Sequence, residues 1–160
     1  MDLHPNVAPL EALLGSWRGL GRGEYPTITS FEYADEWVFS HSGKPFIAFV
    51  QRTRSPAGQP MHTESGYLRA IGEAAVEIVT AIPTGQVEMG GGRAVSENGI
   101  LTVTTDASVT RTPTAKQVDR ITRSFTVRGD TLEIEMWMAA VGLGLTHHLS
   151  SRLERADDAR

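Results

Sequence analysis

Apolar and polar residues alternate along most of this chain, which is typical of strands that have two different faces. The alternation is clear over residues 31–39, 76–82 and 132–138, where large apolar side chains occupy every second position or nearly so. Glycine, proline and small polar residues, as at 42–45 and 97–99, separate such segments and indicate turns. The pattern therefore predicts a chain made mainly of short antiparallel strands.

Applied to the whole sequence, this pattern predicts about ten strands. We expect them at 16–23, 30–40, 45–54, 61–70, 75–82, 85–90, 92–97, 100–106, 118–128 with 131–140, and 145–155. If the two paired segments are separate strands, the number rises to eleven. The longest stretch without an assignment, 107–117, contains a proline and is expected to form a functional loop.

Only residues 6–14 have helical spacing. Asn6 is the expected N-cap, Pro9 suits the first turn, and Gly15 ends the segment. One face of this helix would carry Val7, Leu10, Leu13 and Leu14. We expect a helix of this length to cover one end of a barrel.

Short antiparallel strands from end to end form either a sandwich or a closed barrel. A barrel of eight to ten strands has room for one ligand, whereas a sandwich fills its core with side chains. The length of 160 residues suits one domain. The expected fold is therefore all-β, a single domain over residues 1–160 that forms a ten-stranded, up-and-down antiparallel β-barrel with a short N-terminal helix.

The charge of the chain argues against two classes of partner. A net charge of −4, with no block of lysine or arginine, disfavours nucleic-acid binding, which depends on neutralising phosphates. The apolar runs are too short to cross a bilayer, and the first residues lack the layout of a signal peptide. We therefore expect a soluble, cytoplasmic protein.

The sequence contains no cysteine. This excludes disulfides, cysteine-based zinc sites, thiolate-ligated haem and covalent c-type haem attachment. Metal chemistry would have to use other side chains. The candidate imidazoles are His4, His41, His62, His147 and His148.

A glycine-rich run opens the strand region. Gly15, Trp17, Gly19 and Gly21, continued by Gly23, alternate so that the glycines share one face of a strand. Either a ligand approaches that face closely, or the barrel closes tightly there with Trp17 filling its base. A phosphate loop is improbable, because no helix follows the run.

Two histidine motifs are candidates for a ligand site. His147 and His148 are adjacent, so strict alternation points them to opposite faces of a strand, and a change at the outward one is expected to be silent. If Leu149 marks the interior, His147 is the buried one. The other candidate is His62, which shares a face with Glu64 and can either line a cavity or bond that carboxylate.

Several sequence blocks together resemble the signature of the nitrobindin family. They occur in the same order and span nearly the whole chain. The blocks are Gly-x-Trp-x-Gly-x-Gly at 15–21 continuing to Tyr25-Pro26-Thr27, Gly43-Lys44-Pro45, Pro60-Met61-His62 with Gly66-Tyr67-Leu68-Arg69, and Thr146-His147-His148-Leu149.

This resemblance implies a ten-stranded barrel that holds one non-covalent haem b per chain near an open end. It implies that His148, the histidine directly before leucine, is the axial iron ligand and acts in catalysis through that iron. Thr27 and Lys116 would lie near the haem, and the lysine could pair with a propionate. The cavity would be lined by Met61, His62 and Met138. The implied activities are isomerisation of peroxynitrite to nitrate at ferric haem and binding of nitric oxide, with a homodimer left open.

A second interpretation is a non-enzymatic carrier of a small hydrophobic ligand, similar to lipocalins and fatty-acid-binding proteins. Lipocalin-like barrels also begin with a Gly-x-Trp strand, so this motif does not separate the two interpretations. A third is a structural domain with a filled barrel. Haem absorbance distinguishes the first from the second, and a sizeable cavity argues against the third.

Overall fold

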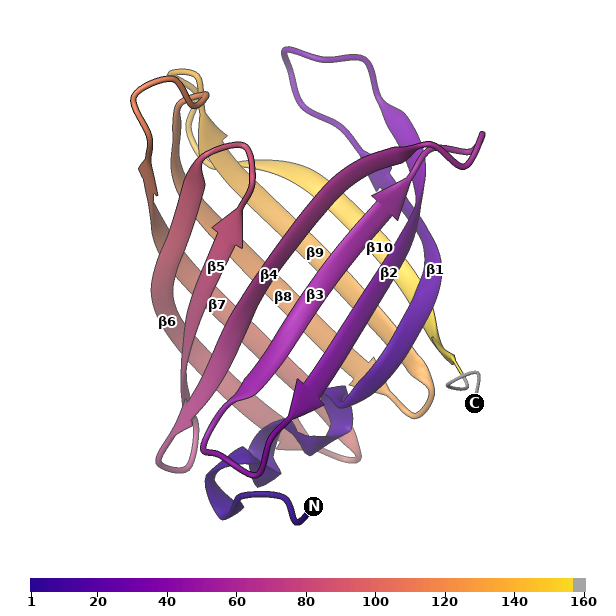
Figure 1. The fold of residues 1–160 in the computed structure, drawn as a ribbon, viewed down its shortest axis with the longest axis vertical. Coiled ribbons are helices and arrows are strands. Elements are labelled where there is room, and N and C mark those ends of the chain that lie inside the picture. The colour runs from indigo at the N-terminus through magenta and orange to yellow at the C-terminus, as the bar shows by residue number, and fades with distance from the viewer. Residues whose placement is uncertain (157–160) are drawn as a thin grey trace.

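Ten antiparallel strands close into a barrel in the computed structural model, which describes residues 1–156 (Figure 1). Each strand pairs with its neighbours in sequence, and the last pairs with the first. This confirms the predicted fold. The elements are η1 (Pro5–Leu13), β1 (Gly15–Gly23), β2 (Phe31–His41), β3 (Ile47–Arg54), β4 (Pro60–Ile71), β5 (Ala75–Ile82), β6 (Gln86–Glu97), β7 (Ile100–Arg111), β8 (Val118–Arg128), β9 (Thr131–Ala140) and β10 (Thr146–Ala156).

Two of the predicted assignments differ from the structure, and one alternative that was left open is decided. The segments 85–90 and 92–97 are one strand, β6, because its central glycines continue the ladder with β7. A Cβ at Gly92 would lie 1.7 Å from the carbonyl oxygen of Thr104, so the close pairing itself requires glycine there. In contrast, 118–128 and 131–140 are separate strands. Residues 107–111 belong to β7, which leaves only 112–117 as a loop.

Element η1 covers one end of the barrel (Figure 1). It is a 3-10 helix, and its N-cap is His4 rather than the predicted Asn6: the His4 ring accepts a hydrogen bond from the Asn6 amide. Three fully buried side chains of η1 join the main core: Val7, Leu10 and Leu13. Trp17 is buried beside them and donates from Nε1 to the Leu13 carbonyl at 2.8 Å. Within residues 1–156, no helix is long and apolar enough to cross a membrane.

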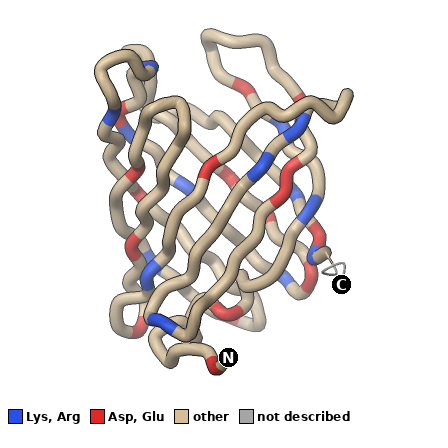
Figure 2. The backbone as a smooth tube through the Cα atoms, viewed as in Figure 1, with Lys and Arg blue, Asp and Glu red and all other residues tan. Residues whose placement is uncertain are grey.

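The connections between strands alternate between the two ends of the barrel (Figure 1). Short turns lie beside η1 at the closed end, and the loops 24–30, 55–59, 83–85, 112–117 and 141–145 surround the open end. The main core fills the closed half, where Trp37, Phe39, Phe49 and Phe125 pack together. Acidic and basic residues are interspersed along the wall (Figure 2).

Candidate functional site

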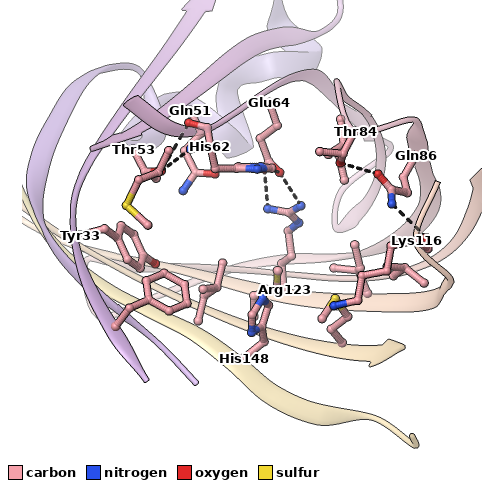
Figure 3. A pocket seen from close by; sticks show the side chains of 18 residues that line it. Tyr33, Gln51, Thr53, His62, Glu64, Thr84, Gln86, Lys116, Arg123 and His148 are labelled. Carbon is pink, nitrogen blue, oxygen red and sulfur yellow. Dashed lines mark hydrogen bonds and ion pairs between the residues drawn. The ribbon is translucent and has the colours of Figure 1, made fainter. Parts of the chain in front are cut away.

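A cavity of about 410 Å³ lies at the open end of the barrel. Most of its wall is apolar and comes from strands far apart in sequence, so only barrel closure brings these residues together. The apolar lining consists of Phe31, Met61, Ile82, Val118, Ile121, Met136, Met138 and Leu149. Polar side chains gather at the floor and around the mouth (Figure 3).

Five of the predicted site residues line this cavity. They are Met61, His62, Lys116, Met138 and His148. Thr27 does not line it, because it lies exposed in the loop 24–30 that extends beyond the end of β1. His62 and His148 come from β4 and β10, which are nearly opposite in the barrel, with β1, β2 and β3 between them on the shorter side.

A β-bulge explains why His148 lines the cavity although strict alternation favours His147. In the ladder between β9 and β10, His147 pairs with Trp137 and Leu149 pairs with Met136, so His148 is an extra residue. The bulge resets the alternation, and both His148 and Leu149 line the cavity. Strict alternation from Leu149 therefore assigns His147 to the interior, which is wrong.

The ring of His148 is fixed by the backbone of the loop after β1. Its Nδ1 lies 2.9 Å from the carbonyl oxygen of Glu24, which can only accept, so Nδ1 carries the proton. Burial, together with the positive charges of Lys116 and neighbouring histidines, lowers the pKa of His148. The ring is therefore neutral near pH 7, and Nε2 carries the lone pair that a metal requires.

His147 lies outside the cavity and both of its ring nitrogens meet carboxylates. Nδ1 is 3.0 Å from the Glu24 carboxylate and Nε2 is 2.5 Å from that of Glu135. Although partial burial alone would lower its pKa, these hydrogen bonds raise the pKa of His147. A protonated ring that donates from both nitrogens has no lone pair left for a metal.

The glycine face of β1 is covered by aromatic rings of the protein. A Cβ at Gly21 would lie 2.3 Å from the ring of Tyr33, and one at Gly23 would lie 2.2 Å from that of Phe31. Both rings line the cavity. Here the glycines make room for the cavity wall, while Trp17 closes the opposite end.

A buried ion-pair network, which we did not predict from the sequence, forms part of the cavity floor (Figure 3). Arg123 on β8 donates to Glu64 on β4 at 2.6 Å and to Glu88 on β6 at 2.7 Å. All three side chains are almost completely buried. Although burial raises the pKa of Glu64, the guanidinium lowers it to about 2. Glu64 also lies 3.2 Å from Nε2 of His62, which fixes that ring at the cavity wall.

A second buried network completes the floor. Asp35 on β2 accepts hydrogen bonds from Gln51 at 2.9 Å, from Ser151 at 2.7 Å and from Trp37 at 3.2 Å. Tyr33 shares a hydrogen bond with Ser151 at 3.1 Å. Burial raises the pKa of Asp35. The floor is therefore a polar layer built from β2, β3, β4, β6, β8 and β10.

The donor set suits one kind of cofactor. Among residues 1–156, no group of three or more His, Cys, Asp or Glu is arranged to hold a bare metal ion. The neutral imidazole of His148 beside apolar walls suits a metal that a flat macrocycle already holds. The exposed Lys116 at the mouth suits an acidic edge of that ligand. The residues present therefore fit haem.

Known proteins share this architecture and sequence. The family model described as "THAP4-like, heme-binding beta-barrel domain" matches residues 6–155. Peroxynitrite isomerase 2 of Mycobacterium ulcerans is 49% identical over 158 residues, covering 96% of this chain and 97% of that protein. Peroxynitrite isomerase of Nocardia farcinica is 48% identical over 155 residues, covering 96% and 92%. The crystal structure of Rv2717c from M. tuberculosis superposes with a TM-score of 0.95 at 42% identity, covering 98% of this chain and all of that one.

Proposed function

This chain belongs to the family of THAP4-like, haem-binding β-barrel domains, and from that premise we propose that it is a haem-dependent peroxynitrite isomerase whose iron ligand is His148. One non-covalent haem b per chain would occupy the open end of the barrel. The proposal rests above all on one observation. His148 donates its Nδ1–H to the Glu24 carbonyl, which leaves the Nε2 lone pair of a neutral, cavity-lining ring available to an iron.

Other residues of the cavity support this assignment. The thioethers of Met136 and Met138 and the ring of Phe31 offer apolar contact to a flat macrocycle. Lys116, which lines the cavity, could pair with a propionate at the mouth. Because the sequence lacks cysteine, the haem would be held without a thioether bond, as b-type haem is.

The chain itself has little chemistry to perform. When bound, haem iron supplies the electron-poor centre at which the O–O bond of peroxynitrite is broken and nitrate is formed. Because isomerisation leaves atoms and charge unchanged, no protein nucleophile and no net proton transfer are needed. The residues of the barrel would hold the cofactor and limit side reactions with water. His62, from the nearly opposite strand β4, lines the same cavity.

The floor of the cavity argues against the carrier interpretation. A carrier that holds the carboxylate of a fatty acid at the floor needs a free cation there, but Arg123 is already paired with Glu64 and Glu88, and Lys116 lies at the mouth. Two carboxylates around one guanidinium leave this part of the floor with a net negative charge. A fatty-acid carboxylate would be repelled there.

Haemin titration and rapid kinetics test the proposal. We expect the wild type to take up one haemin per chain with a Soret band and to accelerate peroxynitrite decay with nitrate as the product. His148→Ala should lose most of its haemin affinity, because it removes the coordinate bond. The proposal is overturned if the wild type takes up no haemin, if loaded protein leaves the decay rate unchanged, or if His148→Ala binds haemin as tightly as the wild type.

Nitric oxide binding at the same iron is a further part of the proposal, because the face opposite His148 would be open to any small ligand. A shift of the Soret band of the ferrous, haem-loaded protein on addition of nitric oxide would measure this binding. A homodimer and a cytoplasmic location stay predictions from the sequence.

A further inference from the structure

Glu24, the first residue after β1, is held to β10 at three points. Its amide donates to the carbonyl of His148 at 2.8 Å, and its own carbonyl accepts from Nδ1 of His148 at 2.9 Å. The third contact joins its carboxylate to Nδ1 of the outward-facing His147 at 3.0 Å. Two adjacent histidines on opposite sides of the wall thus contact the same residue of the loop 24–30.

We propose that His147 is a positioning residue for His148: by holding Glu24 against β10, it fixes the carbonyl that orients the cavity-lining ring. The inference rests on the proposed function, in which His148 binds haem iron. The alternation of residues along the strand predicted instead that the outward histidine could be replaced without effect. The present inference differs from that prediction.

The ladder between β1 and β10 ends just before Glu24. Glu24 lies beyond the last residue of β1, where the ladder with β10 ends at the pair of Gly23 and Leu149. Beyond that pair, the Glu24 amide is held by the His148 carbonyl, and the contact with His147 restrains the Glu24 side chain.

The ring of His147 is itself well fixed. Its Nε2 is 2.5 Å from the carboxylate of Glu135 on β9, and the ring of Trp137 packs edge-on against it at 5.3 Å between centroids. On the other side of Glu24, the hydroxyl of Tyr25 donates to the carbonyl of Met138 at 3.1 Å. The start of the loop is thus held to both β9 and β10.

Tyr25 also touches the ring that this arrangement orients. Its ring meets that of His148 edge-on, with 5.4 Å between centroids. The imidazole is therefore restrained by a hydrogen bond at Nδ1 and by one aromatic contact. Because the hydrogen bond sets which nitrogen faces the cavity, a displaced Glu24 would change the tautomer as well as the angle of the ring.

Four variants separate this role from a general effect on folding. Glu24→Ala keeps the carbonyl that accepts from His148, so any effect on His148 must come from lost restraint. His147→Ala removes both contacts of that ring. His147→Asn places an amide nitrogen near the position of Nδ1 and can keep the contact with Glu24. His147→Gln places it near Nε2 and can keep only the contact with Glu135.

The matched control is Arg152→Gln. Arg152 is also an outward residue of β10 that pairs with a carboxylate of β9, Glu133 at 2.7 Å, and it does not line the cavity. Far-ultraviolet circular dichroism of each variant verifies that the barrel is folded. All measurements are made at one pH.

Two readouts are used. In haem-free protein, the ¹⁵N chemical shifts of the His148 ring report which nitrogen carries the proton. In loaded protein, the transfer of haemin to a scavenger gives its dissociation rate. We expect Glu24→Ala, His147→Ala and His147→Gln to reduce the Nδ1–H population and to release haemin roughly three- to tenfold faster. His147→Asn and Arg152→Gln should behave like the wild type.

Contrary results are distinguishable. If His147→Ala keeps the wild-type tautomer and dissociation rate, or if His147→Asn is as impaired as His147→Gln, His147 does not act through Glu24 and the inference is overturned. If His148→Ala retains haemin, the proposed function fails instead. In that case the tautomer measured without haem still decides whether His147 positions His148.

Discussion

Inward-facing polar side chains of this barrel differ in how their charge is compensated. Arg123 is enclosed by two carboxylates, and His148 is neutral and bonded to a backbone carbonyl. Lys116 is exposed at the mouth, where its backbone carbonyl accepts from Gln86 at 3.1 Å and fixes this part of the loop. An anion that enters the open end therefore meets the charge of Lys116 before the negatively charged floor.

Replacement of Lys116 by glutamine should slow the reaction with the peroxynitrite anion. We expect the second-order rate constant of the loaded protein to fall roughly two- to fivefold at low ionic strength, and the difference to shrink as salt screens the charge. Stopped-flow measurements at two salt concentrations check this. The control is Lys44→Gln, the other lysine of the sequence, exposed in the turn at the closed end. Equal effects of the two substitutions would contradict a local role for Lys116.

At the scale of elements, alternation predicted the strands and their faces but not their irregularities. Leu132, Ile134 and Met136 face inward as expected. The bulge at His148 depends on the register with β9, and the continuity of β6 depends on its pairing with β7. Neither can be deduced from one strand alone, because both are properties of a pair.

The alternation pattern of the sequence does contain evidence for the polar network on the cavity floor. Arg123 lies between Ile121 and Phe125 at inward positions of β8, and Glu64 shares the inward face of β4 with Leu68. A charged residue at an inward position requires a buried partner. Which carboxylates pair with Arg123 could not be predicted, because β4, β6 and β8 are brought together only by closure of the barrel.

Element η1 should contribute stability without taking part in binding. Leu10→Ala removes a fully buried side chain at the closed end, and we expect the free energy of unfolding to fall by about 2–5 kcal/mol. Haemin affinity of the folded protein should not change. Urea denaturation and haemin titration measure the two effects. The matched control is Leu20→Ala on β1, whose side chain is 73% exposed, with a change of about 0.5 kcal/mol or less. If Leu10→Ala also lost haemin affinity, the prediction that η1 contributes only to stability would be wrong.

For the whole molecule, the two buried polar networks divide the barrel into two compartments. None of the residues in the larger apolar cluster lines the cavity. The pair of Arg123 and Glu64 joins β8 to β4 across the interior, while Asp35 and Ser151 join β2 to β10. Closed pairing of all ten strands of residues 1–156 also leaves no sheet edge in this part of the chain to recruit another strand.

This layer should make the stability of the protein sensitive to acid. The pKa of Glu64 falls from 4.5 to about 2 on folding. Its charge therefore stabilises the fold above pH 4.5, and this contribution, on the order of 3 kcal/mol, is lost as the pH falls towards 2. The raised pKa of Asp35 has the opposite sign and offsets part of the loss.

Urea midpoints measured between pH 6 and pH 2.5 test this dependence. Glu64→Gln should be less stable than the wild type at pH 6, and its midpoint should fall less on acidification, because the titrating group is gone. An equally steep fall in both proteins would show that another group is responsible.

Because of the polar layer, we expect folding of the chain and insertion of haem to be independent steps. Because neither the main core nor η1 contributes a residue to the cavity lining, we expect the chain to fold without haem. The prosthetic group can then be inserted after synthesis, or withdrawn, without disassembly of the base. The supply of haem in the cell, rather than the production of new chains, would then set how much of the protein is active.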